Sequence, residues 1–333
     1  MKKTFKIILI TLAALVAVGS IAAGVAAYRT VFGSIGKIDN ENIVTVAPEM
    51  EDFETDGKKE DAVEVEPESV ELETVPMTDD EKLINIMLVG QDRRPGEGRQ
   101  RSDSMILCSY NPKTNELSII SFLRDLYVKI PGGYSDNRLN APYAFGGFPL
   151  LYDTMKENFG ITIDGGVEVD FDGFVELIDL LGGIDVQLSY EEAYEVNKEC
   201  REYSYCEEGK NHLDGEAALA YARIRSIDSD FARAGRQRTV LLKLYEKAKK
   251  SSPETLMQLF KKALSMVTTD MTDGEMISIA TKLLPKLASV RISTYTVPAE
   301  GDYQYASIRE MSVLVPDLPA IKEKLENEYL PLD

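Results

Sequence analysis

An uncharged apolar run near the N-terminus limits what this chain can become more than any other feature. Ile7–Tyr28 contains no charged residue over its 22 positions. A helix that crosses a bilayer needs about 20 apolar residues, whereas the apolar part of a cleaved signal peptide is usually only about 7 to 15 residues long. The run therefore favours a retained transmembrane helix, although the small residues at 24–26 would also suit a signal-peptide cleavage site.

The charges beside this run indicate its direction. Lys2, Lys3 and Lys6 precede it, whereas Arg29 and Lys37 follow it. Positive charge favours the cytoplasmic side of a membrane, and here the difference between the two sides is modest. We expect a single-pass protein of the cell membrane with a cytoplasmic N-terminus at residues 1–6, an anchor at 7–28 and an extracytoplasmic remainder.

A strongly acidic segment comes next. Residues 39–81 hold 17 Asp and Glu against two Lys, together with three prolines and little apolar periodicity. Like charges extend a chain, so we expect residues 29–81 to be an acidic extracytoplasmic linker. The whole chain carries a net charge of −19, which argues against nucleic acid as a partner because phosphate binding needs a basic face.

From residue 82 onward, short β-rich runs alternate with helical stretches. This order predicts one α/β domain over 82–333, with helices on both faces of a sheet. Strands are predicted at Asn85–Val89, Ser104–Ser109, Leu117–Phe122, Val167–Val169, Ile184–Leu188 and Ile292–Val297. Helices are predicted at Tyr143–Asn158, where Pro149 interrupts or restarts the helix, and at Phe171–Leu181, Gly215–Arg223, Phe231–Lys250, Pro253–Met266, Asp273–Leu284 and Pro319–Tyr329.

The cysteines are few. The chain has three cysteines and one histidine, too few for a structural zinc site of the usual Cys and His type. Cys200 and Cys206 lie close together in a polar loop, where an oxidising compartment would permit a disulfide. Two free thiols are the alternative.

The arginines are unevenly spread. Of the 14 arginines after residue 81, 11 fall into two windows, 91–140 and 221–238. A planar guanidinium offers paired donors and stays charged, which suits phosphate, so we expect the two windows to fold around one anion. The arginines of the two windows are Arg93, Arg94, Arg99, Arg101, Arg124, Arg138, Arg223, Arg225, Arg233, Arg236 and Arg238.

Carboxylates stand near the same strand ends. Asp92 follows the first predicted strand, Asp103 precedes the second and Asp125 follows the third. Ligands often bind at strand ends in α/β sheets, and Asp92 and Asp103 together would suit Mg²⁺. The alternative is that each aspartate only pairs with a neighbouring arginine on the surface.

Nine short motifs follow one another in the sequence between Asn85 and Thr239. They are Gly90-Gln91-Asp92-Arg93, Arg101-Ser102-Asp103-Ser104, Ser121-Phe122-Leu123-Arg124-Asp125, Asn140-Ala141-Pro142-Tyr143-Ala144, Val169-Asp170-Phe171-Asp172-Gly173-Phe174, Gly182-Gly183-Ile184-Asp185-Val186, Leu213-Asp214-Gly215, Tyr221-Ala222-Arg223-Ile224-Arg225 and Asp230-Phe231-Ala232-Arg233-Ala234-Gly235-Arg236-Gln237-Arg238. Their order after a single N-terminal span closely resembles the LytR-CpsA-Psr family. Ala232 departs from the pattern, which has glycine there, and would alter the backbone if that glycine has φ > 0.

The resemblance implies a three-layer α-β-α domain with a central mixed sheet, and an extracytoplasmic phosphotransferase of Gram-positive-type cell walls. Such enzymes move an anionic glycopolymer, such as teichoic acid or capsular polysaccharide, from a polyprenyl diphosphate carrier to peptidoglycan. By the family pattern, Asp92 and Asp103 would bind Mg²⁺, or Mn²⁺ in its place, and the polyprenyl tail would lie in an apolar tunnel. The diphosphate would be held by Arg101, Arg124, Arg223, Arg225, Arg233 and Gln237.

Catalysis would then depend on charge neutralisation and one proton acceptor. Arg101, Arg124 and Arg233 would stabilise charge on the phosphate oxygens, and Asp125 or a metal-binding aspartate would take the proton of the acceptor hydroxyl. Two alternatives stay open: a polyprenyl diphosphate phosphatase, in which water replaces the acceptor, and a non-enzymatic module that only binds the diphosphate or wall polymer. Transcriptional regulation is disfavoured by the anchor and the acidic charge.

Overall fold

The computed structural model describes residues 36–40, 43–56, 63–73, 83–90, 99–169, 171–200, 205–250 and 267–332. Several predictions fall outside these ranges: the cytoplasmic N-terminus at 1–6, the anchor at Ile7–Tyr28, the predicted metal ligand Asp92, Arg93 and Arg94 of the first arginine window, and the helix at Pro253–Met266. Within the described ranges, no helix combines the length and the apolar character that a membrane crossing requires.

A mixed sheet forms the centre of the described domain. Its strands are β1 (Gly36–Lys37), β2 (Ile84–Gly90), β3 (Ser104–Asn111), β4 (Glu116–Phe122), β7 (Gly165–Val169), β10 (Val267–Thr269) and β11 (Arg291–Val297). They lie in the order β1-β10-β7-β2-β3-β4-β11. β2 is parallel to β7 and antiparallel to β3, and β4 is antiparallel to β3 and parallel to β11. The predicted mixed sheet is confirmed.

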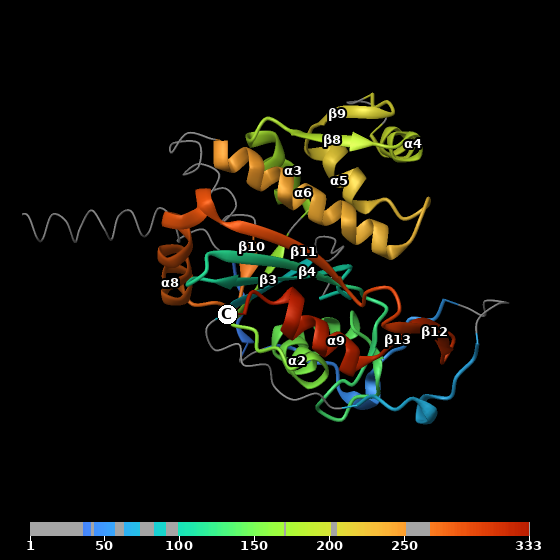
Figure 1. Cartoon of the computed structure of the whole chain (residues 1–333). Helices are drawn as coiled ribbons and strands as arrows, with labels where there is room; N and C mark the ends of the chain where they lie inside the picture. The colour runs from blue at the N-terminus through green and yellow to red at the C-terminus, as the bar shows by residue number, and fades with distance from the viewer. Residues whose placement is uncertain are drawn as a thin grey trace, which may run out of the picture.

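Helices cover both faces of this sheet. They are α2 (Ala141–Phe159), α3 (Phe171–Leu180), α4 (Tyr190–Glu199), α5 (Gly215–Arg223), α6 (Asp230–Lys250), α8 (Asp273–Leu283) and α9 (Leu318–Lys324). Figure 1 shows α3, α5 and α6 on one face of the sheet and α2 and α9 on the other. The three-layer α-β-α architecture is therefore confirmed.

The two faces of the sheet are filled differently. On the side of α2 and α9, residues such as Met87, Leu107 and Phe148 form one continuous buried core. On the other side, α3 and α5 share a separate buried cluster with a small hairpin of β8 (Ile184–Leu188) and β9 (Gly209–Leu213). The space between the sheet and this second cluster is where the functional site lies.

Glycine determines the shape of α2. Gly147 has φ 66° and ψ −154°, which are not helical values. The helix is therefore interrupted, as predicted, but the break lies at Gly147, two residues before Pro149. A Cβ at Gly147 would also lie 2.8 Å from Cδ1 of Ile43 and 3.1 Å from Cζ of Arg99. Only glycine fits this combination of backbone and close packing, so the break in α2 brings Arg99 and residue 43 against the helix.

Part of the acidic segment packs on the domain instead of extending away from it. Val65 N–H donates to the Ser307 carbonyl at 2.9 Å, and Ser307 N–H donates to the Val63 carbonyl at 2.8 Å. Leu72 is only 5% exposed. Isolated apolar residues among the acids provide buried surface that holds residues 43–56 and 63–73 in place, whereas repulsion between the acidic residues alone would extend the segment.

A second hairpin was not predicted. β12 (Tyr303–Ile308) and β13 (Met311–Pro316) pair antiparallel. Their turn consists of Arg309 and Glu310, which have φ of 51° and 61°. Tight hairpin turns need positive φ and usually use Asn-Gly or Asp-Gly, so Arg-Glu gave no turn signal. The smaller hairpin of β5 (Tyr127–Val128) and β6 (Asn137–Arg138) was also missed.

Helix ends agree closely with the sequence signals. Asp214 caps α5 by accepting from the Ala217 N–H at 2.9 Å. The predicted helix at Asp273–Leu284 ends one residue earlier, and the chain continues through Pro285 as a 3₁₀ helix, Leu284–Ser289. Proline is tolerated there because the first residues of a helix have no intrahelical partner for their N–H groups.

Candidate functional site

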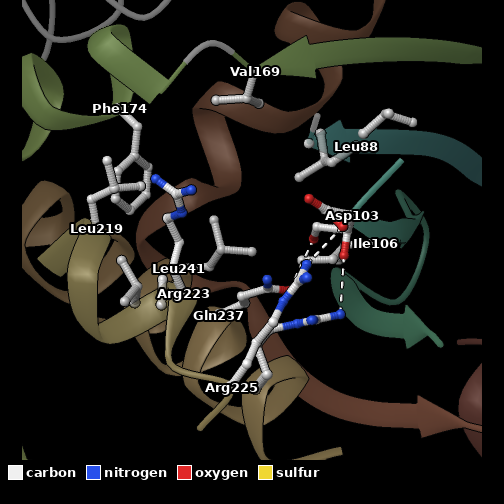
Figure 2. Close-up of a pocket in the computed structure, with 16 residues that line it drawn as sticks. Leu88, Asp103, Ile106, Val169, Phe174, Leu219, Arg223, Arg225, Gln237 and Leu241 are labelled. Atoms are coloured by element: carbon white, nitrogen blue, oxygen red, sulfur yellow. Dashed lines mark hydrogen bonds and ion pairs between the residues drawn. The ribbon is translucent and has the colours of Figure 1, made fainter. Parts of the chain in front are cut away.

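Three arginines, Arg124, Arg225 and Arg233, gather with three aspartates near the ends of β2, β3 and β4. Asp103 stands at the centre: its Oδ1 lies 3.1 Å from Nη1 of Arg124 and 2.7 Å from Nη2 of Arg225. Its main-chain carbonyl accepts from Nη2 of Arg233 at 3.3 Å. Figure 2 shows Arg225 reaching to Asp103. Both arginine windows of the sequence therefore meet here.

Asp230 holds the other side of this cluster. Its Oδ1 lies 2.8 Å from Nη1 of Arg233, and its Oδ2 accepts from Nε of Arg124 at 3.4 Å. Asp125 lies beside the same guanidinium, with Oδ1 3.6 Å from Nε of Arg124. Arg124 thus contacts three carboxylates at once.

The two neighbouring carboxyl groups have opposite pKa shifts. Burial, and a hydrogen bond to Asp230 that favours the protonated form, raise the pKa of Asp125 to about 6. Burial also opposes ionisation of Asp230, but the hydrogen bond from Asp125 and the charges of Arg233 and Arg124 outweigh it and lower the pKa of Asp230. Asp125 is therefore the member of the pair that can take up or release a proton near neutral pH.

The guanidinium groups also differ. Burial lowers the pKa of Arg233 to about 10, and the nearby charges of Arg225 and Arg124 act in the same direction. Burial opposes the charge of Arg124 too, but Asp125, Asp230 and Asp103 outweigh it and raise its pKa. Positive charge is thus least favourable at Arg233, so a bound anion would stabilise the site most at that point.

An apolar pocket opens beside the cluster. It has a volume of about 280 Å³ and lies between the sheet and helices α3, α5 and α6. Its ionic end is formed by Asp103, Arg225, Arg233 and Gln237. Its apolar walls come from the sheet, α3, α5 and α6: Leu88, Val89, Ile106, Val169, Phe174, Leu219, Ala222, Val240 and Leu241. The pocket fits a molecule that has an anionic head and an apolar chain.

Arg223 and Arg225 point in different directions. Figure 2 shows the Arg223 guanidinium toward Phe174, among the apolar walls, and the Arg225 guanidinium toward Asp103. Ile224, between them, is buried in the apolar cluster of α3, α5 and the β8–β9 hairpin. Two arginines separated by one residue at the end of α5 thus reach different parts of one pocket.

A second, polar pocket lies on the other side of Asp103. It has a volume of about 560 Å³, and Arg101 and Arg124 line it together with Asp52 and Glu54 of the acidic segment. Arg101 Nη2 donates to the main-chain carbonyl of Asp52 at 2.8 Å and to its Oδ1 at 2.9 Å. A carboxylate of this chain therefore occupies the face of Arg101 that a phosphate oxygen would need.

The predicted site residues are partly brought together. Arg124, Asp125, Arg225 and Arg233 converge at Asp103, and Gln237 lies beside them, with its Oε1 accepting from Oγ of Ser104 at 2.9 Å. Arg101 lines the second pocket together with Asp103 and Arg124. Arg223 lines the first pocket, but its guanidinium points away from Asp103 (Figure 2).

Two other arginines of the windows, Arg236 and Arg138, are neutralised by acidic residues of the fold. Arg236 is buried against Asp228, with Nη1 2.7 Å from Oδ2, and against Glu192 at 3.3 Å. Arg138 is buried too and pairs with Asp56 of the acidic segment, and its Nε also lies 3.5 Å from Oδ1 of Asp125 at the edge of the cluster. The expectation that both windows surround one anion is therefore wrong for Arg236, because Asp228 and Glu192 neutralise it away from the cluster.

Asp230 was overlooked as a site residue. The i, i+3 spacing of Asp230 and Arg233 on one helix could have indicated their ion pair. Asp52 and Glu54 were overlooked because they lie in the segment interpreted as a linker. Ala232 lies inside α6 and is not among the residues with positive φ. Alanine in place of the family's glycine is therefore compatible with the backbone at this position.

The metal prediction rests on one described residue. Asp103 supplies carboxylate oxygens of the hard type that Mg²⁺ prefers, and its Oδ1 is engaged by Arg124 and Arg225. Within the described ranges, no group of three or more His, Cys, Asp or Glu side chains is placed to hold a metal ion. An ion at Asp103 would therefore need oxygens from a substrate phosphate or water in addition to this carboxylate.

The fold and the site define an α/β protein with an apolar pocket that ends at a buried arginine–carboxylate cluster. The LytR_cpsA_psr family model matches residues 42–327. This chain belongs to that family, as its motifs predicted, and the match begins inside the acidic segment that packs on the domain.

Several known proteins are similar to this chain. Biofilm regulatory protein A of Streptococcus mutans is 34% identical over 257 residues, covering 70% of this chain and 62% of that protein. The polyisoprenyl-teichoic acid–peptidoglycan teichoic acid transferase TagU of Bacillus licheniformis is 30% identical over 281 residues, covering 84% of this chain and 82% of that protein. The structure of TagT bound to LIIa-WTA is similar to this one, with a TM-score of 0.61 and 25% sequence identity. The match covers 77% of this chain and 94% of that one. For several of its relatives, including the S. mutans protein, the chain spans less than two thirds of the relative's length.

Proposed function

We propose that this protein is a phosphotransferase that moves an anionic glycopolymer, of the teichoic acid or capsular type, from a polyprenyl diphosphate carrier to peptidoglycan. The observation that carries the proposal is the apolar pocket that ends at Asp103, Arg225 and Arg233. A polyprenyl diphosphate has the matching form, a long apolar chain with an anionic head. The name of the TagU relative and the ligand of the TagT structure support the same reaction.

The site would bind the carrier in two parts. The polyprenyl chain would lie against Leu88, Ile106 and Leu241, where burial of each methylene contributes about 0.8 kcal/mol. The diphosphate would take the place of carboxylate contacts at Arg225, Arg233 and Arg124, and also at Arg101 if Asp52 moves aside. Charge-assisted hydrogen bonds from guanidinium groups make this exchange favourable.

The transfer itself needs one nucleophile and one leaving group. The acceptor hydroxyl oxygen forms a bond to the phosphorus nearest the glycan, while the bond from that phosphorus to the bridging oxygen breaks and polyprenyl monophosphate leaves. The hydroxyl proton passes to Asp125, whose pKa of about 6 suits a base at neutral pH. Arg124 and Arg233 stabilise the charge that develops on the phosphate oxygens.

Mg²⁺ belongs to the same proposal. Asp103 and Asp92 would hold the ion, with Mn²⁺ as a substitute, and the ion would supply neutralising charge to the diphosphate when bound. Asp103 would then exchange part of its pairing with Arg124 and Arg225 for the metal. The placement is also proposed: the anchor at 7–28 would hold the domain outside the cell membrane, where peptidoglycan lies.

Turnover by the full chain in detergent or nanodiscs tests the proposal. The protein is incubated with Mg²⁺ and a polyprenyl diphosphate-linked sugar, with and without peptidoglycan fragments, and the lipid and sugar products are followed. Release of polyprenyl monophosphate that depends on the fragments supports a transferase. Release without them supports a phosphatase, and binding without any release supports a binding module.

A further inference from the structure

Three aromatic side chains form a continuous face next to the arginine–carboxylate cluster. Phe231 stacks on Tyr303 with 5.4 Å between ring centroids and 30° between planes. Tyr305 meets Tyr303 edge to face at 5.2 Å and 87°, and their hydroxyls lie 3.5 Å apart. Tyr305 is 70% exposed although it is a large aromatic residue. We call Phe231, Tyr303 and Tyr305 the aromatic face.

This face is joined to Asp125 and Asp230 of the site. Phe231 directly follows Asp230 at the start of α6. Tyr305 lies opposite Leu314 in the β12–β13 hairpin, and the Leu314 N–H donates to the main-chain carbonyl of Asp125 at 2.8 Å. Opposed Cα atoms of paired strands lie only about 5 Å apart. The pairing of Tyr305 with Leu314 and the hydrogen bond from Leu314 therefore connect the aromatic face to the main chain of Asp125, and one peptide bond connects Phe231 to Asp230.

The face is also held rigidly. Asp302, next to Tyr303, is only 6% exposed and pairs with Lys324 of α9, whose Nζ lies 2.7 and 2.6 Å from the two carboxylate oxygens. The Asp302 carbonyl accepts from the Asp317 N–H at 2.9 Å, closing the open end of the hairpin. A surface whose shape is fixed before binding loses little conformational entropy when a ligand arrives.

We propose that the aromatic face binds a pyranose ring of the acceptor peptidoglycan and presents its hydroxyl to the Asp125–Asp230 pair. One face of a pyranose is lined with C–H bonds, whose partial positive charge is attracted to the negative face of an aromatic ring. Tyrosine adds a hydroxyl that can hydrogen-bond the sugar at the edge of the ring. The inference rests on the proposed function, because it assigns the acceptor of that same reaction.

The arrangement of the site favours the acceptor over the carrier as occupant. The apolar pocket lies between the sheet and α3, α5 and α6, and it leads to Arg225 and Arg233. None of the three aromatic residues lines that pocket. The proton acceptor Asp125 connects instead to the hairpin, so a sugar on the aromatic face would bring its hydroxyl to the carboxylates from the side away from the apolar chain.

The test measures acceptor and carrier binding separately on the full chain. The acceptor probe is a soluble glycan fragment of alternating N-acetylglucosamine and N-acetylmuramic acid, and the carrier probe is a polyprenyl diphosphate. Tyr305→Ala should weaken glycan binding roughly tenfold, since an aromatic contact contributes that much, and leave carrier binding unchanged. Tyr305→Phe, which keeps the ring, should restore most of the affinity. Tyr194→Ala is the matched control, because this tyrosine is 60% exposed on α4, away from the site.

Each outcome decides the proposal. If glycan binding is the same in Tyr305→Ala as in the unchanged protein, or if the unchanged protein does not bind the glycan, the acceptor assignment is overturned. If Tyr305→Ala lowers carrier affinity equally, the face belongs to the carrier and the assignment also fails. Glycan binding that depends on Tyr305, in a protein that transfers nothing, would support the aromatic face and contradict the proposed reaction instead.

Discussion

Arg225 and Asp103 lie 122 positions apart in the chain, yet Nη2 of Arg225 lies 2.7 Å from Oδ1 of Asp103. This ion pair connects the residue directly before β3 with the segment that follows α5. It closes the polar end of the apolar pocket. An incoming diphosphate would find both halves of its binding site already adjacent, so little of the binding energy would be lost to folding the site.

Arg124→Ala should nearly abolish transfer and leave the fold intact. This guanidinium contacts all three carboxylates, those of Asp103, Asp125 and Asp230. Loss of a group that stabilises transition-state charge typically lowers turnover roughly 10²- to 10³-fold. Turnover and the thermal midpoint measure the two effects. Arg291→Ala is the control, since Arg291 is exposed and pairs with groups at the far end of β4, such as Glu116. Equal turnover in Arg124→Ala and the control would remove Arg124 from the site.

The rate of transfer should fall as the pH is lowered through about 6. Burial and the hydrogen bond to Asp230 raise the pKa of Asp125 to about 6, and a protonated carboxyl cannot accept the hydroxyl proton. The profile of kcat against pH measures this ionisation. In Asp125→Asn the remaining slow rate should lose this limb of the profile. A limb that persists unchanged in the variant would assign the ionisation to another group.

Asp125→Asn should not destabilise the fold above pH 6. A folded pKa above the unfolded value means that the protonated form is favoured by folding, so this stabilisation is full at low pH and is lost as pH rises through about 6. Asparagine stays neutral throughout and avoids that loss. Thermal unfolding at pH 5 and pH 8 tests this, and a variant that loses stability only at pH 8 would contradict it.

Asp52→Asn should strengthen carrier binding a few-fold. The Asp52 carboxylate lies 2.9 Å from Nη2 of Arg101 and competes with phosphate for that guanidinium. The effect is limited because Asp52 is 74% exposed, and an exposed ion pair contributes at most about 1 kcal/mol. Titration with a polyprenyl diphosphate at low and high salt measures it. Glu66→Gln, an exposed acid on the same segment, should change nothing. Weaker binding in Asp52→Asn would show that Asp52 assists the ligand.

Leu241→Trp should weaken binding of long polyprenyl chains more than short ones. Leu241 lines the apolar pocket of about 280 Å³, and a larger ring there would displace part of the chain. Loss of two buried methylenes, at about 0.8 kcal/mol each, corresponds to roughly tenfold in affinity. Binding of two diphosphates that differ only in chain length measures the difference. Leu180→Trp, on the exposed side of α3, serves as control. A loss independent of chain length would contradict the assignment of the pocket.

Local sequence signals predicted most of the sheet and its covering helices. The buried runs that became β2, β3 and β4 are rich in Ile, Leu and Met, and the Asp214 cap marked the start of α5. The β12–β13 hairpin escaped because its Arg309-Glu310 turn adopts positive φ without glycine or asparagine. Tertiary contacts hold that turn, and no local pattern reveals them: the Asp56 N–H donates to the Glu310 carbonyl at 3.1 Å, and Nη1 of Arg309 donates to the Asp136 carbonyl at 3.2 Å.

The site was harder to predict than the fold. The motifs indicated Arg124, Arg225 and Arg233 correctly as neighbours. They could not show that Arg236 is neutralised by Asp228, since that pairing depends on how the loop before α6 folds back. The contact of Asp52 with Arg101 was hidden for another reason: high negative charge predicts extension only when no apolar residue anchors the segment.

The fate of one phosphorus atom tests the central claim most directly. A polyprenyl diphosphate-linked glycan is labelled at the phosphorus nearest the sugar and incubated with the full chain, Mg²⁺ and peptidoglycan fragments. The proposed transfer predicts that the label moves with the glycan into the peptidoglycan and that the released polyprenyl monophosphate carries none. Label that stays with the lipid while the sugar moves, or label released in soluble form without reaching peptidoglycan, would contradict it.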